Sequence, residues 1–592
     1  MILAGIALAG VAQVVTDPGS EPVEIVTADP TTTAGLDPTL ATSTTLAEPF
    51  VYRVGVLSGV TTDNFWAFYG EQPSVWNSYI LGPTKPALFT ADSSLSSLQP
   101  ELAAADAEPS KDAGGWQVVV DLRSDLAWSD GAPVTAHDLV FTFQTVRDLG
   151  LGGSWAEAFP ETVRSLEAVG EHRVRIEFEG RPQLSVWPHG VGLAPIMARH
   201  VWQGSVDGVT KKELYDLPGD VDVGGGPLTV VSVSDELVVS QANSGYPGAG
   251  TPETIEYHVY ANETLAVAAL GEGKIDTILS PRGLAGDHLR AVESDPGVSV
   301  LNSPGNVIRY LGFNLDRDPM SDQAFRTALA LLIDRDGLAD TIPGAGQAAW
   351  SLVPQANTRW FDAGEAKKTT RRYEGSLDDR LAAAIATLEE AGYAWETPPG
   401  VDAEGTLTAG TGLIIDGSAP PPLTILTPGD EYDPARPEYV GKIAGVLGAI
   451  GFDARPVETD FDTVVDIAFT PGDDGALQYD MYLLGWTLGN PALPGYYRTL
   501  FAADGAMNNT GYRSAAFAKA LQTYEEAHTL DDARDALWAM ERRLALDLPY
   551  LPLYSSDIAE VYRSDRIEFD MGPSLGGLQA RQGGIWDVAP AG

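Results

Sequence analysis

Groups that could act in catalysis are abundant in this chain, but their arrangement predicts no catalytic site. The 592 residues include 82 aspartates and glutamates, so any chosen pair of carboxylates would be arbitrary. The seven histidines are scattered, and no two stand four residues apart. We expect no nucleophile elbow, no H-E-x-x-H zinc motif and no Walker-type phosphate loop. The sequence therefore predicts a protein that is not an enzyme and that carries no cofactor and no metal.

Large aromatic residues in loops and at strand ends are the more suggestive feature. Side chains of this kind either form the wall of a ligand cleft or seal a core. By themselves they favour the sealing of a core. The residues in question are Trp66, Trp76, Tyr79, Trp486, Tyr496 and Tyr497.

Strand and helix patterns alternate along the body of the chain, which indicates an α/β architecture. Trp116 to Leu122 is a predicted strand, and Arg173 to Phe178 alternates as a half-buried strand does. Between them, Thr135 and Asp138 form a T-x-x-D capping box that predicts the start of a helix. Because chains beyond roughly 250–300 residues divide into domains, we expect two lobes and an additional subdomain.

The charge balance is strongly acidic, with 37 Lys and Arg against 82 Asp and Glu and a formal net charge of −45. Such a surface repels phosphate backbones and anionic lipid, so no nucleic-acid partner is expected. A cationic or neutral solute would be tolerated. The chain has no cysteine, which excludes disulfides, thiolate nucleophiles and cysteine-based zinc sites.

The first 48 residues differ in composition from the rest. Ile2 to Val14 is apolar, too short to span a bilayer at about 20 residues, and resembles the h-region of a signal peptide. We expect residues 1–15 to be the remnant of an export signal and residues 16–48 to be a flexible linker rich in Thr, Pro, Ala and Asp. This predicts an extracytoplasmic protein, secreted, at the cell surface or in the periplasm. No lipid anchor is expected, because Val11 stands where a lipoprotein cysteine would.

One segment carries a specific pattern: Trp128 to Asp138 reads W-S-D-G-A-P-V-T-A-H-D, a turn followed by the capped helix. With several further blocks, the chain resembles the peptide- and nickel-type solute-binding proteins of ABC importers, family 5. The motif itself needs only turn chemistry, with Asp130-Gly131 turning the chain, so we interpret it as structural. The further blocks, in family order, are Gly225–Leu228, Ala268–Asp276, Tyr310–Asn314 continuing to Arg335, Tyr479–Trp486 and Asn508–Tyr512.

The resemblance implies an α/β, two-lobed periplasmic-binding-protein-like fold of type II, in the large class with an extra subdomain and a central ligand cleft. Residues 49–305 and 555–592 would form lobe 1, which includes an inserted subdomain at about 70–190, and residues 306–554 would form lobe 2. The chain would cross between the lobes near 306–310 and near 549–554. Solute would close the lobes, because it contacts both faces only in the closed form.

The resemblance also suggests which residues contact the solute. In peptide-binding members an acidic residue shortly after the Gly-Trp pair holds the ammonium of the peptide, but the run from Gly485 to Pro491 contains no Asp or Glu. Nickel is disfavoured because no histidine cluster is visible. The expected substrate-binding residues are Asn64, Trp66, Trp486, Thr487 and Asn490.

The expected function is capture of a peptide or related organic solute by a monomer and its delivery to an ABC permease in the membrane. Two alternatives remain open. One is an extracytoplasmic hydrolase. The other is a signalling or scaffold protein that retains the binding-protein fold.

Overall fold

The computed structural model describes residues 50–591, apart from 61–63, 67–73, 92–96, 152–158, 218–222, 248–251, 285, 343–345, 373–374, 431, 473–474 and 490. The expected signal remnant and linker therefore lie outside the described residues. None of the described helices combines the length and the apolar composition needed to cross a bilayer. The expected α/β fold class is confirmed, because strands and helices alternate around two large mixed sheets.

The first sheet has seven strands, and β1 lies near its centre between two parallel neighbours. Helices α5 (Glu263–Gly271) and α6 (Gly286–Glu293) contribute to a small core with β11 and β23. In spatial order the strands are β12 (Val298–Pro304), β23 (Asp557–Arg563), β11 (Thr277–Ile278), β1 (Val51–Val56), β10 (Thr254–Val259), β9 (Leu237–Ala242) and β8 (Leu228–Val233).

A four-stranded antiparallel sheet shares the main core of the first sheet. Its strands, in order, are β4 (Ser110–Asp112), β5 (Gly115–Asp121), β7 (Arg173–Phe178) and β6 (Val163–Ala168). One continuous cluster of buried side chains joins it to β1, because Tyr52 and Val54 belong to the same cluster as Val118 and Val174. The helices of this region are α1 (Val75–Leu81), α2 (Ala136–Asp148), α3 (Arg199–Val206) and α4 (Lys211–Asp216).

The predicted turn and cap between β5 and α2 are confirmed. Gly131 has a φ of 88°, a left-handed conformation that glycine adopts without strain. Both bonds of the capping box between Thr135 and Asp138 are present at the start of α2. The carboxylate of Asp130 accepts from the Ala132 N–H at 3.0 Å, so this motif holds a turn together.

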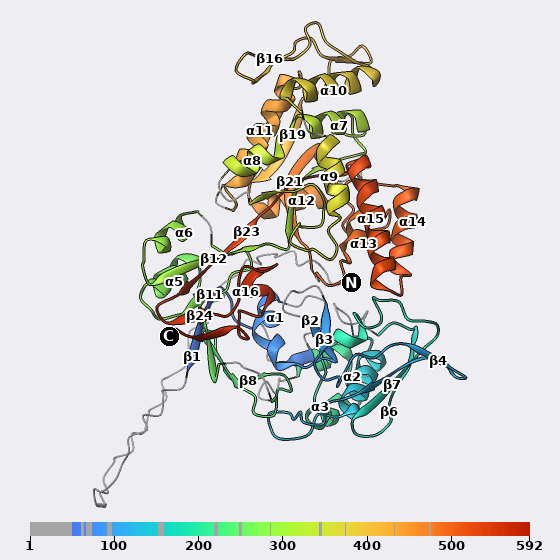
Figure 1. The fold of residues 1–592 in the computed structure, drawn as a ribbon, viewed down its shortest axis with the longest axis vertical. Coiled ribbons are helices and arrows are strands. Elements are labelled where there is room, and N and C mark those ends of the chain that lie inside the picture. The colour runs from blue at the N-terminus through green and yellow to red at the C-terminus, as the bar shows by residue number, and fades with distance from the viewer. Residues whose placement is uncertain are drawn as a thin grey trace, which may run out of the picture.

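The second sheet has six strands and a layer of helices on each face, so it forms a three-layer unit (Figure 1). Its strands, in order, are β14 (Gln347–Ala348), β22 (Tyr550–Ser555), β13 (Val307–Phe313), β21 (Met481–Thr487), β19 (Leu423–Pro428) and β20 (Ala454–Thr459). One face packs against α7 (Gln323–Leu332), α10 (Leu377–Glu390) and α11 (Ala435–Ala449). The other packs against α12 (Phe461–Phe469), α13 (Tyr496–Phe501), α14 (Ala515–Glu525) and α15 (Leu530–Asp547).

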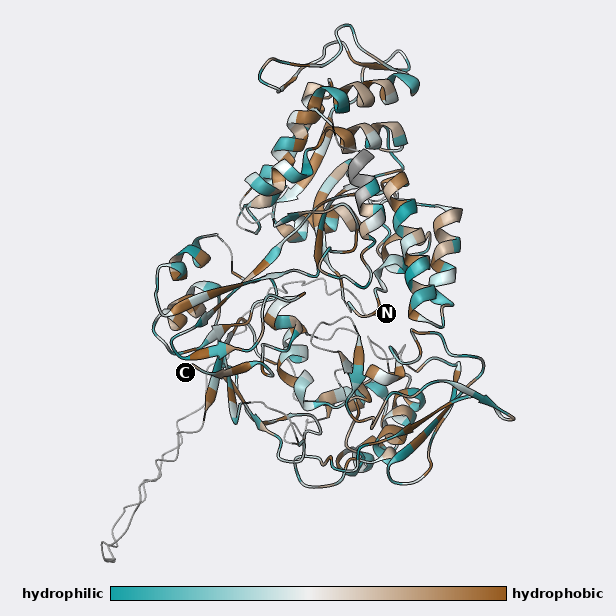
Figure 2. Cartoon of the chain, in the orientation of Figure 1, coloured by the Kyte–Doolittle hydropathy of each residue, from teal (hydrophilic) through white to brown (hydrophobic). Residues whose placement is uncertain are grey.

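The remaining elements are short or peripheral. Figure 2 shows apolar and polar residues interleaved along the covering helices, as expected for helices that pack one face against a sheet and expose the other. A hairpin excursion between α10 and β19 lies at the end of the molecule far from the first sheet (Figure 1). These elements are β2 (Phe89–Ala91), β3 (Leu98–Pro100), α8 (Arg335–Thr341), α9 (Ala363–Arg372), β15 (Tyr393–Ala394), β16 (Gly400–Val401), β17 (Leu407–Thr408), β18 (Ile414–Ile415), β24 (Ile567–Phe569), α16 (Gly577–Ala580) and β25 (Val588–Pro590).

The chain passes twice between the two large sheets. It leaves β12 of the first sheet and enters β13 of the second across Gly305 and Asn306, and it returns from β22 to β23 across Ser556. We call residues 50–304 and 557–591 the first half and residues 307–555 the second half. The sequence predicts crossings near 306–310 and near 549–554. The first range begins at the crossing residue Asn306 and continues into β13, and the second lies almost entirely in β22, just before the crossing at Ser556.

Candidate site at the junction of the two sheets

The order of strands in the second sheet marks one edge as the place for a ligand. Strand β19 is parallel to both of its neighbours, β20 and β21. Helix α11 leads from β19 to β20, and α12 then leads back past β19 to β21. The carboxyl end of β19 is therefore a topological switch point, where side chains and backbone groups from diverging loops leave room for a ligand.

The first sheet presents an equivalent edge, and the two edges meet. Strand β1 is parallel to β10 and to β11, which α5 connects. Four residues beyond β11, the Cζ atom of Arg282 lies 4.7 Å from the ring centroid of Tyr432, four residues beyond β19. The carboxyl ends of the parallel strands of both sheets thus meet at the contact between Arg282 and Tyr432, which we call the junction.

Charged and aromatic side chains of the second half pack around Tyr432 and Asp433 next to this contact. The Tyr432 ring stacks on Phe461, with centroids 4.4 Å apart and 11° between the planes. Asp433 accepts from Nε of Arg436 at 2.9 Å and lies 3.8 Å from Nε of Arg309. Burial lowers the pKa of the Arg309 guanidinium, and the neighbouring Arg436 lowers it further against the opposing effect of Asp433.

A glycine makes room for Arg309. Arg309 on β13 is directly opposite Gly485 on β21. A Cβ at position 485 would lie 2.5 Å from Cδ of Arg309 and 2.6 Å from its Nη1, so any larger residue would displace the guanidinium. The absence of a side chain at Gly485 thus leaves room for the Arg309 side chain beside β21.

The register of β13 and β21 decides which side chains share a face with Arg309. Opposite residues of an antiparallel pair project to the same face, and faces alternate along a strand. Thr487 is opposite Val307 and is exposed, so it lies on the arginine face beside the first crossing. Trp486 projects to the other face, where it is 7% exposed and packs edge-on against Phe469 at 5.8 Å. Asn490, the third residue expected here, lies outside the described residues.

The two candidates from the first half, Asn64 and Trp66, have contacts within that half in this structure, and their role in solute binding stays a prediction. The Asn64 amide is buried and donates to the carbonyls of Leu214 at 2.7 Å and Leu217 at 3.1 Å. Trp66 is fully buried, with edge-on contacts to Phe141 and Trp202 at 6.1 Å each. Both side chains are therefore buried within the first half in this structure.

The two halves also touch away from the crossings. The Leu184 N–H donates to the carbonyl of Ala527 at 3.0 Å, and His528 Nδ1 lies 2.9 Å from the carbonyl oxygen of Pro182. Nη2 of Arg359 donates to Oγ of Ser97 at 2.8 Å. The structure thus holds the halves in contact at places other than the Arg282–Tyr432 contact.

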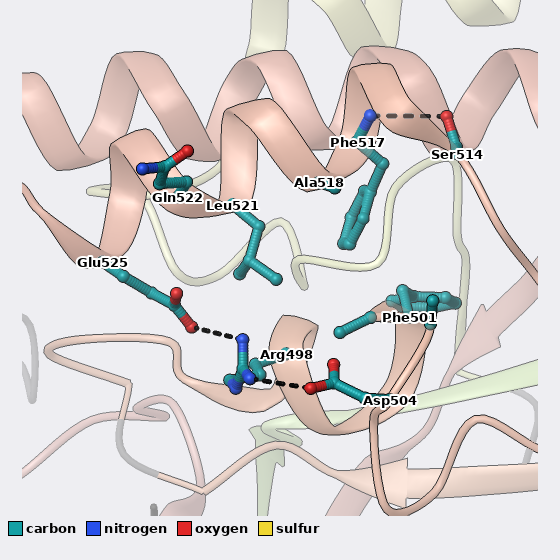
Figure 3. Close-up of a pocket in the computed structure, with 11 residues that line it drawn as sticks. Arg498, Phe501, Asp504, Ser514, Phe517, Ala518, Leu521, Gln522 and Glu525 are labelled. Carbon is teal, nitrogen blue, oxygen red and sulfur yellow. Dashed lines mark hydrogen bonds and ion pairs between the residues drawn. The ribbon is translucent and has the colours of Figure 1, made fainter.

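Two of the measurable pockets lie within the second half and not at the junction. One of about 310 Å³ lies between α13 and α14, with Phe501, Phe517 and Leu521 along it and Arg498 between Asp504 and Glu525 (Figure 3). The other, of about 610 Å³, is lined by residues of 314–317, 469–478 and 506–513. No residue of the first half lines either pocket, so neither could be shared by two closing halves.

One expectation about catalytic motifs, the absence of a G-x-S-x-G string, was wrong. A G-x-S-x-G string does occur, at Gly572–Gly576. It lies between the short strand β24 and the four-residue helix α16, and Oγ of Ser574 is buried with no hydrogen-bond partner among the described residues. No group of three or more His, Asp or Glu side chains in the described part of the chain is placed to hold a metal ion.

Four residues at this site were not predicted from the sequence: Arg282, Arg309, Tyr432 and Arg436. Nothing in the local pattern marks them, since each is one of many charged or aromatic residues in the chain. The available signal was positional: Tyr432-Asp433-Pro434 follows a predicted strand and precedes a predicted helix, as residues at a switch point do.

Comparison with known proteins agrees with this architecture. The family model described as bacterial extracellular solute-binding proteins, family 5, matches residues 97–508. The peptide transport periplasmic protein SapA of Salmonella typhimurium is 23% identical over 475 residues, which cover 75% of this chain and 76% of SapA. The structure of the oligopeptide-binding protein AppA from Bacillus subtilis, in complex with a nonapeptide, superposes with a TM-score of 0.62 at 18% identity, over 92% of this chain and all of that one. The ABC transporter substrate-binding protein CtaP of Listeria monocytogenes gives a TM-score of 0.69 at 16% identity, with 92% and 100% of the two chains covered. With a fold built around two joined sheets and a family match over most of its length, the chain belongs to the family 5 extracellular solute-binding proteins.

Proposed function

We propose that this protein captures a peptide or related organic solute at the junction and delivers it to an ABC importer permease. The observation that carries the proposal is the meeting of the two sheets' carboxyl ends at Arg282 and Tyr432. Two crossing segments join the halves, so the halves can separate and close as hinged bodies. A micromolar affinity corresponds to about −8 kcal/mol, which several contacts from both halves can supply.

The division of the chain follows from the same proposal. Residues 49–305 with 555–592 act as lobe 1, including the subdomain at about 70–190, and residues 306–554 act as lobe 2. Thr487 is the expected solute contact that the strand register favours, and Trp486 supports it from the opposite face. Asn490 stays a proposed contact.

A peptide is favoured by the similarity to SapA, a peptide transport protein, and to AppA, an oligopeptide-binding protein. The absence of Asp or Glu from Gly485 to Pro491 argues for recognition of parts of the solute other than a free ammonium. We further propose that the protein acts outside the cytoplasm as a monomer and changes no covalent bond of its solute.

Closure can be tested by locking the halves together. Because the chain has no cysteine, a Ser97→Cys, Arg359→Cys variant carries the only thiols, at a contact away from Arg282 and Tyr432. A short bismaleimide should cross-link them, and cross-linking after loading with a peptide pool should trap bound peptide that the uncross-linked variant releases on dialysis. Each single-cysteine variant is the control. Free exchange of peptide in the cross-linked protein, or no saturable rise in melting temperature with peptides, sugars or metal ions, would reject capture by closure.

A further inference from the structure

Away from the junction, one segment of the first half is anchored in the second half. Residues 182–189, which we call the latch segment, lie between β7 and α3. The Leu184 side chain is 9% exposed and packs in a hydrophobic cluster whose other described members, such as Trp360 and Ala527, all belong to the second half. The Leu184 N–H also donates to the carbonyl of Ala527 at 3.0 Å. Because this contact buries apolar surface without any solute, it favours the closed arrangement by itself.

The latch segment ends at a histidine that is unsuited to carry a positive charge in this arrangement. Nδ1 of His189 is buried and has no hydrogen-bond partner in the described part of the chain. Burial lowers the pKa of His189 from 6.5 to about 4, and the positive charge of Arg359, on the second half, contributes to the fall. Arg359 itself is held at the contact, since its Nη2 donates to Oγ of Ser97 at 2.8 Å. A proton on His189 is therefore disfavoured as long as the halves are in contact.

The other charged and titratable groups of this contact do not offset the repulsion. The Cζ atom of Arg181, next to the latch segment, lies 5.8 Å from the ring centroid of Trp116. Nδ1 of His528 lies 2.9 Å from the carbonyl oxygen of Pro182, a bond that a protonated ring can still donate. No carboxylate among the described residues acts on His189. The repulsion between a protonated His189 and Arg359 would thus remain uncompensated.

We propose that the latch segment is an acid-sensitive closing device: with His189 neutral it holds the halves together, and protonation of His189 beside Arg359 releases them. The inference goes beyond the proposed function, because the solute takes no part in it, but it rests on the proposed separation of the halves. Such a protein would hold its solute in a neutral medium and release it in an acidic one.

Protonation favours the open form because His189 then leaves Arg359 and the second half, and its pKa rises toward 6.5 from about 4. The open form therefore binds the proton more tightly than the closed form does. Closure should be unaffected above about pH 7.5 and should weaken as the pH falls from 6.5 to about 4. If the pKa returns fully to 6.5, the ratio of open to closed protein should be about 30-fold higher at about pH 5 than at about pH 7.5.

The distance between the halves can be measured in the full chain without solute. Because the chain has no cysteine, Ser110→Cys in β4 and Thr408→Cys in β17 provide two exposed spin-label sites, one in each half. Pulsed electron paramagnetic resonance then gives the open and closed populations at about pH 7.5 and about pH 5. His189→Gln removes the titrating ring. His137→Gln is the matched control, because the His137 side chain is half exposed in α2 and pairs with Glu171 of the same half.

The labelled wild type and His137→Gln should be mostly closed at the higher pH, and the ratio of open to closed protein should rise roughly 10- to 30-fold at the lower pH. His189→Gln should stay closed at both values, and Arg359→Gln should reduce the rise because its guanidinium is absent. Leu184→Ala should open the protein at both values, since it removes the apolar anchor. Circular dichroism checks that each variant is folded.

A rise of the same size in His189→Gln would overturn the inference, and so would a solute-free wild type that is open at about pH 7.5. Either result would leave solute capture intact, as calorimetry with a pool of tripeptides at the higher pH would show. One unchanged distance in every variant and at both pH values, with or without the tripeptides, would mean that the halves do not separate. The proposed closure would then fail, and the inference would fail with it.

Discussion

The two sheet edges that meet at the junction are built in different ways. The edge of the first half contributes Arg282, an exposed arginine on a loop, while Asn64 and Trp66 of the same half are buried. The edge of the second half is a compact set of packed groups, in which Phe461, Tyr432 and Asp433 hold one another and the arginines in place.

This difference assigns separate roles to the halves. Preorganised groups lose little entropy on binding, so the second half is suited to select the solute. A single exposed side chain on the first half is suited to complete the site on closure. Four substitutions and one pH titration test this assignment, in decreasing order of the expected change in stability or affinity.

Replacement of Trp66 by Ala should lower the free energy of unfolding by about 3–5 kcal/mol, because a fully buried indole leaves a cavity. Urea unfolding measures the change, and the folded variant should bind solute as the wild type does. Trp586→Ala is the matched control, since this indole is 39% exposed and its loss should cost less than about 1 kcal/mol. Normal stability with lost binding would place Trp66 in the site and end the contrast between the halves.

The stability of the first half should depend on pH through Glu560. Burial raises the pKa of this carboxyl from 4.5 to about 7, although both carboxylate oxygens accept from the Leu578 N–H. The folded protein therefore holds a proton that the unfolded chain releases above pH 4.5. The associated stability, about 3 kcal/mol, is fully present below pH 4.5 and is lost as the pH rises to about 7.

Urea unfolding between pH 4.5 and 8 checks this, with Glu560→Gln expected to reduce the slope. Burial also raises the pKa of Glu101, in the same half, to about 7, so part of the slope should remain in that variant. A profile that Glu560→Gln leaves unchanged would contradict the assignment.

Gly485→Ala should lower the free energy of unfolding by about 1–3 kcal/mol, because the new methyl group would overlap Arg309. Solute binding should weaken as well, since the guanidinium must move. Gly441→Ala on α11 is the control, because a Cβ there meets no other atom within 4 Å. Loss of stability without any change in affinity would separate Arg309 from the site.

Thr487→Val should change the free energy of unfolding by less than about 0.5 kcal/mol, because the side chain is exposed. Its hydroxyl lies on the same face as Arg309, so we expect a several-fold weaker affinity for solute by calorimetry. Thr408→Val, exposed in the distant hairpin excursion, is the control. An unchanged affinity would limit the site to the charged groups.

The sequence predicted the elements and missed the groups that face the junction. The start of α2 follows from Thr135 and Asp138, because a capping box acts within one turn of chain. The strand that carries Gly485, Trp486 and Thr487 was also expected. Trp486 was predicted as a solute contact from its residue type, but the register of β13 and β21 places its side chain on the face opposite to Arg309.

The α/β class, the family and the local caps and turns could be predicted from the sequence, because these depend on periodicity and on motifs within short stretches. The contact of Arg282 with Tyr432, 150 residues farther along the chain, and the burial of Asn64 and Trp66 are visible only in the folded protein. The reason is physical. Strand order, strand register and the two crossings are long-range properties, and no local pattern of residues encodes which side chains they bring together.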